Sequence, residues 1–294
     1  MFDLTSVYQA RSVADALEAL ARCPEAQVIA GGTDVLVQVR EGRRAGARLV
    51  SIHGLREELA GVRADPSEDL YIGPLTTFRE VTEHPLIRDQ VPVLGEAADQ
   101  VGGPQIRAMG TIGGNLCNGV TSADTASTLV ALEAELTLTG GRGGRTLPIS
   151  RWYLGAGRVA LEPGELLTGI RIPRDSFAGV GGCYIKYAQR SAMDIATLGV
   201  SCLVRLTPDR TRVDRLRLAF GVAGPVPVRA LEAEELARGL TVDEAAARVG
   251  RAALAELKPR DSWRASRAFR EQLIAELSGR ALRQAAERGG AEHA

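Results

Sequence analysis

Two glycine-rich segments contain the residues of this chain that are best suited to chemistry. The first reads Val28-Ile29-Ala30-Gly31-Gly32-Thr33-Asp34-Val35-Leu36, and the second reads Gly110-Thr111-Ile112-Gly113-Gly114-Asn115-Leu116-Cys117-Asn118-Gly119. Glycine has no side chain to bury, but it permits positive φ and lets other groups approach the backbone closely. We expect Gly113 and Gly114 to adopt positive φ, so that successive N–H groups turn inward and form a concave anion site that suits a diphosphate.

Polar side chains accompany both segments. Amide and hydroxyl groups suit phosphate oxygens, whereas an acid suits the hydroxyls of a ribose or ribityl chain. The candidates are Thr33 and Asp34 in the first segment, and Asn115, Thr121, Ser122 and Asp124 in or after the second. One glycine pair alone would indicate a plain surface turn, but two similar segments can hold one diphosphate from both sides. The pattern indicates a nucleotide cofactor, and neither segment has the spacing of a Rossmann or P-loop motif.

The composition is that of a globular chain with one large domain or two. Apolar residues make up 45% of the 294 residues. The chain has 33 glycines, a larger share than the glycine content of about 7% in an average protein. Lys+Arg and Asp+Glu both number 36, so the formal net charge is zero and no basic stretch indicates a nucleic-acid partner. A net charge near zero is also compatible with a protein that works inside a complex.

The cysteines and the N-terminus argue against two further classes of protein. Cys23, Cys117, Cys183 and Cys202 have no metal-ligand spacing, so the sequence predicts reduced thiols and no zinc or iron–sulfur site. No basic region followed by an apolar core opens the chain. The longest mostly apolar run, 196–204, is shorter than the roughly 20 residues that a spanning helix needs. We therefore expect a cytoplasmic protein without a membrane partner.

Apolar periodicity predicts an α+β protein in which each glycine segment connects two buried elements. Predicted strands cover 26–30, 49–52, 70–73, 134–139, 166–173, 184–190, 196–206 and 213–222. Predicted helices cover a short stretch after the Ser12 capping signal, and then 77–100, 125–132, 241–257 and 261–288. Pro85 and Pro92 are expected to break the helix at 77–100. Asp124 is a candidate cap for 125–132, and Ser262 is the expected cap for 261–288. Gly140 to Gly144 indicate a plain hairpin turn, because no helix follows them.

These elements divide the chain near a linker at 173–182. We expect a first domain at 1–176, made of subdomains at about 1–56 and 57–176. The second domain, 177–294, is expected to be a small α+β unit with a three-stranded antiparallel sheet that closes over the cofactor.

The two segments resemble the FAD-binding loops in the flavoprotein subunits of molybdenum hydroxylases. Ala30-Gly31-Gly32-Thr33-Asp34 and Thr111-Ile112-Gly113-Gly114-Asn115 carry the resemblance, in this order and at about this spacing. It extends to Ser191-Ala192-Met193-Asp194-Ile195-Ala196-Thr197 and to Asp261-Ser262-Trp263-Arg264-Ala265-Ser266, and so covers nearly the whole chain. The likeness is greatest to FAD subunits of bacterial three-subunit xanthine dehydrogenases, over 114–119 and 121–124. It implies a two-part FAD-binding domain of the PCMH type and a flavoprotein C-terminal domain.

The resemblance also implies roles for individual residues. Lys186 and Asp194 match a cation and an acid close to the flavin, where they would tune the flavin rather than act as acid, base or nucleophile. The plain alternatives are an exposed strand lysine for Lys186 and a helix or turn cap for Asp194. Asp124 matches an acid that binds the cofactor's hydroxyls. The implied cofactor-binding residues are Ile29, Ala30, Gly31, Gly32, Thr33, Asp34, Val35, Val101, Gly110, Thr111, Gly113, Gly114, Asn115, Thr121, Ser122, Asp124, Leu167 and Lys186.

The implied activity is electron transfer through non-covalently bound FAD. The family's subunits take electrons from [2Fe–2S] clusters on a partner subunit and pass them to NAD⁺, while the molybdenum cofactor lies on a third chain. Two alternatives stay open from the residues alone. One is a stand-alone flavin oxidoreductase, for which no histidine or tyrosine is clearly placed as a substrate base. The other is a non-catalytic scaffold whose glycine segments only pack against partners.

Overall fold

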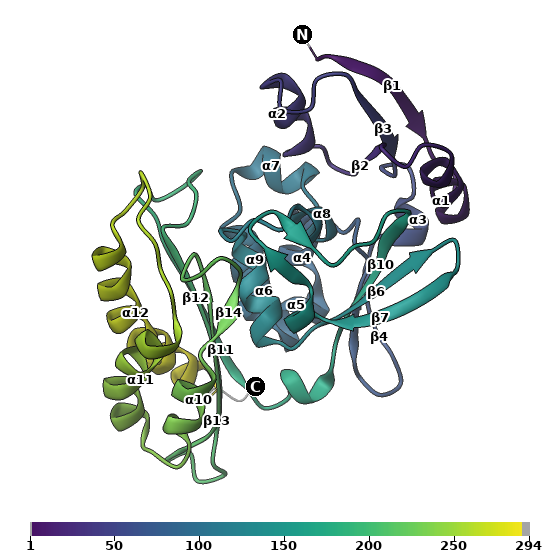
Figure 1. Ribbon diagram of the computed structural model, residues 1–294. Helices are drawn as coiled ribbons and strands as arrows, with labels where there is room; N and C mark the ends of the chain where they lie inside the picture. The colour runs from purple at the N-terminus through teal and green to yellow at the C-terminus, as the bar shows by residue number, and fades with distance from the viewer. Residues whose placement is uncertain (1, 290–294) are drawn as a thin grey trace.

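The computed structural model describes residues 2–289, which form an N-terminal sheet, a larger middle part and a C-terminal part (Figure 1). The N-terminal sheet is parallel with strand order β1-β3-β2. Its strands are β1 (Leu4–Gln9), β2 (Gln27–Ile29) and β3 (Ala47–Ser51), and its helices are α1 (Val13–Arg22) and α2 (Val35–Arg40). The Ser12 side chain accepts from the Asp15 N–H and begins α1, as expected. The first glycine segment therefore runs from the end of β2 into α2.

The middle part is a five-stranded antiparallel sheet covered by short helices. The strand order is β4-β5-β10-β6-β7, with β4 (Val62–Ala64), β5 (Leu70–Ile72), β6 (Glu135–Gly140), β7 (Gly143–Pro148) and β10 (Glu165–Ile172). The helices are α3 (Arg56–Leu59), α4 (Phe78–Glu83), α5 (Pro85–Gln90), α6 (Pro92–Asp99), α7 (Pro104–Met109), α8 (Ile112–Asn118) and α9 (Asp124–Ala131), and a small ribbon pairs β8 (Tyr153–Gly155) with β9 (Arg158–Val159). Pro85 and Pro92 begin helices, because a proline at the first helical position removes only an N–H that has no intrahelical partner.

Buried side chains fix α8 inside this part. Ile112 and Leu116 are fully buried in the main core, and the indole N–H of buried Trp152 donates to the carbonyl oxygen of Leu116 at 3.0 Å. The second glycine segment is thereby held as a helix at the edge of the core.

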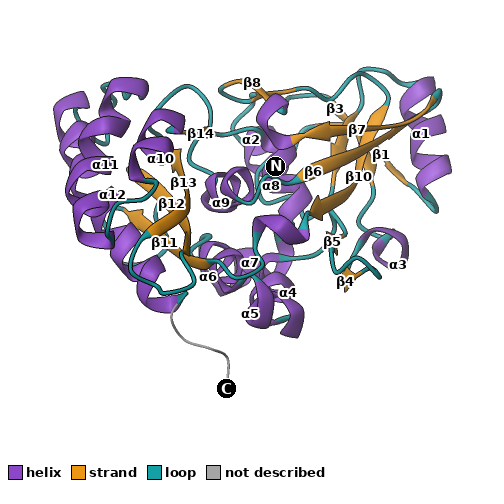
Figure 2. Cartoon of the chain, turned by 90° about the horizontal axis from the view of Figure 1, so that it is seen from below, coloured by secondary structure: helices purple, strands orange, loops and turns teal. Residues whose placement is uncertain are grey.

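The C-terminal part is an antiparallel sheet with helices on its outer face (Figure 2). The sheet has four strands, not the expected three, in the order β11 (Gly181–Tyr187), β12 (Leu198–Leu206), β13 (Val213–Gly221) and β14 (Val228–Arg229). The added strand β14 has only two residues, too few to show an alternating pattern. Helices α10 (Leu231–Ala237) and α12 (Arg267–Arg288) cover one face, and α11 (Val242–Glu256) packs against both of them. Helices α6 and α9 of the middle part contact the other face.

Two expected helix caps are wrong. Helix α12 begins after Ser266, whose side chain accepts from the Phe269 N–H, whereas Ser262 accepts from Arg264 and Arg270. Asp124 is the first residue of α9 and makes no cap; Ala123 is the N-cap residue. The Asp124 side chain instead accepts from Tyr184 and Lys186, which are distant in sequence, whereas the partners of Ser262 are local.

None of the helices within residues 2–289 combines the length and the apolar character that a bilayer crossing requires.

Candidate cofactor site

A cavity of about 800 Å³ lies between the N-terminal sheet and the middle part of the chain. Its walls come from β2, the first glycine segment and α2 on one side, and from α7, α8 and β10 on the other. The volume lies within the roughly 300–1,000 Å³ of typical small-molecule and cofactor sites.

Most residues expected at a cofactor line this cavity. They are Ala30, Gly31, Gly32, Thr33, Asp34, Val35, Val101, Gly110, Thr111, Gly113, Gly114, Asn115 and Leu167. The cavity wall does not include Ile29, Thr121, Ser122, Asp124, Lys186 or Asp194. The two glycine segments, far apart in sequence, thus face one space.

The first glycine segment brings free backbone donors to the cavity. Gly32 has φ +73°, the left-handed conformation that glycine adopts readily. Within residues 2–289, the N–H groups of Gly32, Thr33, Asp34 and Val35 have no hydrogen-bond acceptor. They precede or begin α2, where the helix dipole adds partial positive charge. This segment has the chemistry of an anion site.

The second glycine segment has a different conformation from the one expected. Gly113 and Gly114 are helical residues of α8 without positive φ. Their N–H groups already donate, that of Gly113 to the Pro74 carbonyl at 2.9 Å and that of Gly114 to Thr111 Oγ1 at 3.1 Å. The next N–H, that of Asn115, donates to the Thr111 carbonyl at 3.0 Å. The expected concave N–H site is therefore absent here, and the segment offers the cavity an unobstructed wall.

Close contacts explain the glycines that support these walls. A Cβ atom at Gly31 would lie 1.8 Å from the carbonyl oxygen of Met109, and one at Gly113 would lie 2.4 Å from Cβ of Pro74. At Gly114, by contrast, the nearest atom to an added Cβ is Thr111 Oγ1 at 3.0 Å. Gly31 and Gly113 are needed for packing, whereas Gly114 is open to the cavity.

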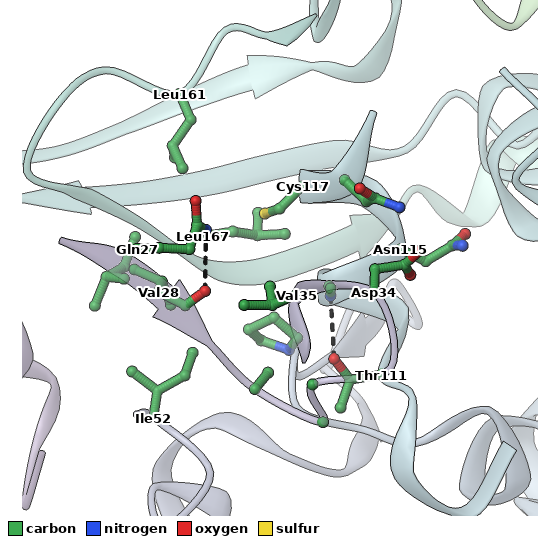
Figure 3. Close-up of a pocket in the computed structure, with 18 of the residues that line it drawn as sticks. Gln27, Val28, Asp34, Val35, Ile52, Thr111, Asn115, Cys117, Leu161 and Leu167 are labelled. Carbon is green, nitrogen blue, oxygen red and sulfur yellow. Dashed lines mark hydrogen bonds between the residues drawn. The ribbon is translucent and has the colours of Figure 1, made fainter. Parts of the chain in front are cut away.

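Apolar side chains line one region of the cavity in two layers. Val28 lies on β2 and Ile52 directly follows β3, whereas Leu161 lies in the loop before β10 and Leu167 on β10 itself (Figure 3). Such a slot suits a flat aromatic ring. Only Leu167 among these four was expected at the cofactor, because the other three belong to apolar runs that are typical of any core.

Polar residues missed by the sequence analysis also reach the cavity. Gln27, Gln38, Arg43 and Arg44 line it near the first glycine segment. Two adjacent arginines, seven and eight residues after that segment, were the available signal, but without the fold they look like an ordinary surface pair.

Two titratable groups in the wall have raised pKa values. Desolvation raises the pKa of the Asp34 carboxyl, although Asn118 and Arg43 act in the opposite direction. Burial raises the pKa of the Cys117 thiol to about 12, so it is neutral at physiological pH. Neither group is activated as a nucleophile.

Asp124 and Lys186 form a buried ion pair beside the cavity rather than in its wall. Lys186 Nζ donates to Asp124 Oδ2 and to the Gln100 carbonyl, each at 2.9 Å, and the Tyr184 hydroxyl donates to Asp124 Oδ1 at 2.7 Å. Desolvation raises the pKa of Asp124, opposed by Lys186 and Tyr184. The cluster joins α9 to β11 and so connects the middle and C-terminal parts.

Of the other expected residues outside the wall, Ile29 is the last residue of β2, and Thr121, Ser122 and Asp194 lie in loops. The Thr121 carbonyl accepts from the Val222 N–H at 3.1 Å, which is a second contact with the C-terminal part. Asp194 accepts from the N–H groups of Arg190 and Ile195, and these hydrogen bonds lower its pKa. Ser122 follows Thr121 in the same turn.

Within residues 2–289, no group of three or more His, Cys, Asp or Glu side chains could hold a metal ion.

Comparison with known proteins identifies the family. Residues 2–175 match the family model described as the FAD binding domain in molybdopterin dehydrogenase. The chain belongs to this family. Residues 183–285 match the C-terminal domain of the CO dehydrogenase flavoprotein. In this family the chain corresponds to the FAD-binding subunit of an oxidoreductase.

Individual relatives match over most or all of the chain. A putative xanthine dehydrogenase FAD-binding subunit of Escherichia coli is 39% identical over 99% of both chains. The FAD subunit of nicotinate dehydrogenase from Eubacterium barkeri is 33% identical over 72% of this chain and 71% of its own. A solved structure of carbon monoxide dehydrogenase from Hydrogenophaga pseudoflava superimposes with a TM-score of 0.92 at 29% identity, covering 98% of this chain and 99% of that one. The fold is the one expected, apart from the fourth strand of the C-terminal sheet.

Proposed function

We propose that this chain is the FAD-binding, electron-transfer subunit of a xanthine dehydrogenase-like molybdenum hydroxylase. The observation that carries the proposal is the 39% identity to the xanthine dehydrogenase FAD-binding subunit over the whole chain. In this proposal electrons arrive from [2Fe–2S] clusters on one partner subunit, substrate is oxidised at a molybdenum cofactor on another, and NAD⁺ is the acceptor. The complex is placed in the cytoplasm and needs neither nucleic acid nor a membrane.

The cavity has the properties that non-covalent FAD requires. Free N–H groups from Gly32 to Val35 suit the diphosphate, and the slot between Val28 and Leu167 suits a planar ring. Gly114 leaves the opposite wall open. When bound, FAD supplies the electron chemistry, which lets the protein act by binding and orienting. The neutral Cys117 thiol favours non-covalent attachment.

Lys186 has a positioning role in this proposal. Its ammonium group is held by the Asp124 carboxylate and the Gln100 carbonyl, and its side chain is only 6% exposed. Gln100 precedes Val101, which lines the cavity. The ion pair therefore fixes the C-terminal part against the segment that forms one cavity wall. The family role of Lys186 and Asp194 beside the flavin stays a prediction.

Anaerobic reduction of the FAD-loaded chain tests the proposal. NADH should bleach the flavin absorbance, because a site that passes hydride to NAD⁺ must also accept it from NADH. Xanthine should leave the spectrum unchanged, since its oxidation needs the partner centres. Acid precipitation should release FAD into the supernatant. Bleaching by xanthine alone would contradict the subunit assignment, and a colourless chain that ignores FAD would favour a scaffold.

A second candidate is the flavoprotein subunit of another molybdenum hydroxylase. The 33% identity to a nicotinate dehydrogenase FAD subunit favours it. Co-purification of the neighbouring subunits, followed by assays with xanthine and with nicotinate, distinguishes the two. The first proposal is lost if the purified complex oxidises nicotinate and not xanthine.

A further inference from the structure

Arg44 stands out among the charged residues of the cavity wall. The wall contains two cationic residues, Arg43 and Arg44, and the acids Asp34, Glu162 and Glu165. Arg43 is already paired with Glu41, at 3.0 Å from its Nε. Within residues 2–289, Arg44 has no ion pair. It is therefore a cation at the cavity whose charge no carboxylate balances.

Two neutral side chains hold the guanidinium of Arg44 in place. Its Nε donates to Gln38 Oε1 at 2.5 Å, and one Nη donates to Gln27 Oε1 at 2.6 Å. Gln27 is itself fixed, because its amide nitrogen donates to the Val28 carbonyl at 3.0 Å (Figure 3). These amides lie on β2 and α2, the two elements that flank the first glycine segment. The cation is thus anchored to both elements that flank the free N–H groups, in the wall of the same cavity.

The guanidinium keeps donors for a ligand. Arginine carries five N–H donors in a rigid fork. Protein acceptors within residues 2–289 take up only the two donors described above. Because glutamine oxygens carry no full charge, they orient the fork without neutralising it. Such a group suits the oxygens of a diphosphate, for which charge-assisted hydrogen bonds are strongest.

The acids of the cavity wall are the reason why an anionic ligand would need a cation here. Glu162 and Glu165 are paired with Arg145, at 3.8 Å and 2.7 Å, so within residues 2–289 Asp34 is the acid of the wall without an ion pair. A dianionic diphosphate next to Asp34 would meet repulsion that backbone dipoles alone must overcome. We propose that Arg44, positioned by Gln27 and Gln38, is the side-chain counterion for the diphosphate of the bound dinucleotide. The inference rests on the proposed function, and it assigns a side-chain contact to a site whose other donors are backbone groups.

Binding to the FAD-free chain tests the inference, with Kd measured by calorimetry for FAD and for ADP. Arg44→Ala should weaken both ligands by about tenfold, since one exposed charge-assisted contact is lost. Arg44→Lys should recover part of the loss, because the charge is kept without the fork. Riboflavin, which has no phosphate, should bind wild type and Arg44→Ala alike. Arg40→Ala, in the last turn of α2 but outside the cavity wall, removes the same charge and should change neither Kd.

Salt and anchor variants separate a specific contact from a general charge effect. The dependence of log Kd for ADP on log salt concentration should be shallower in Arg44→Ala than in wild type. Gln27→Leu with Gln38→Leu should weaken ADP binding while Arg44 is still present. Equal Kd values for FAD and ADP in wild type and Arg44→Ala, with circular dichroism unchanged, overturn the inference and leave the FAD proposal intact. Wild-type protein that binds neither ligand overturns both.

Discussion

The two glycine segments face the same cavity but use their backbones in opposite ways. In the first, the N–H groups from Gly32 to Val35 have no acceptor within residues 2–289. In the second, the N–H groups from Ile112 to Asn115 donate to Thr76, Pro74 and Thr111. The first segment can bind an anion without breaking a protein hydrogen bond. The second is a rigid wall against which a ligand is held.

The difference comes from the neighbours of each segment. Pro74 and Thr76 follow β5 and present their carbonyl groups to the start of α8. In the described part of the chain, residues 2–289, no comparable carbonyl meets the start of α2. Anion binding at a glycine segment therefore depends on whether another part of the chain has already satisfied its donors. A glycine pair alone does not determine this.

The largest effect is expected where glycine allows the two segments to touch. Gly31→Ala places Cβ 1.8 Å from the Met109 carbonyl oxygen, a backbone atom that cannot move alone. We expect the free energy of unfolding to fall by about 3 kcal/mol or more, measured by urea denaturation of the FAD-free chain. Gly141→Ala is the control, since nothing lies within 4 Å of its added Cβ. Equal stability of both variants would show that the contact between the segments is not required.

The second prediction separates binding from folding in the second segment. A Cβ added at Gly114 meets only Thr111 Oγ1 within 4 Å, at 3.0 Å, and Gly114 lines the cavity, so Gly114→Val adds volume to the cavity wall. We expect FAD affinity to fall by about a hundredfold through steric exclusion. The far-ultraviolet circular dichroism should stay unchanged. Full FAD binding by this variant would show that α8 does not form part of the FAD site.

The third prediction concerns the internal hydrogen bond of the second segment. Thr111→Val removes the cap oxygen that accepts from the Gly114 N–H. We expect the free energy of unfolding to fall by about 1 kcal/mol, the usual loss for an N-cap. FAD affinity should change by less than about fivefold, because the N–H groups that bind the diphosphate belong to the first segment. A loss of affinity as large as that of Gly114→Val would show that the second segment binds the ligand directly, and the contrast between the segments would fail.

Much of the lining of the candidate site could be predicted from the sequence, because both glycine segments follow local rules. An apolar strand, a glycine pair and a polar residue are all adjacent in the chain, and thirteen of the expected residues line the cavity. The conformation of Gly113 and Gly114 could not be predicted, since the carbonyl groups of Pro74 and Thr76 that stabilise the start of α8 come from elsewhere. Arg44 was missed for the same reason.

In the fold, too, the features set by neighbouring residues could be predicted, whereas those set by residues distant in sequence could not. The prolines that begin α5 and α6 and the Thr241 cap of α11 are local signals, and these helices lie where the sequence places them. Strand β14 pairs with β13 over two residues, which is too short for a local pattern. The ion pair of Asp124 and Lys186 joins residues from separate parts of the chain, so their mutual contact was not expected.

The smallest effect is expected at Cys117, which belongs to the second segment and lines the cavity. Burial raises its pKa to about 12, so the reactive thiolate is scarce at neutral pH. We expect iodoacetamide to label it slowly in the FAD-free chain, at a rate that rises about tenfold for each pH unit from 7 to 10, in proportion to the thiolate fraction. FAD should slow labelling further if α8 forms a wall of its site.

Buried Cys183 and Cys202 are replaced by serine or alanine for this measurement, and Cys23 by serine, so that one thiol is followed by mass spectrometry. Fast labelling that FAD does not affect would place α8 away from the ligand, and the first segment would then form the site without it.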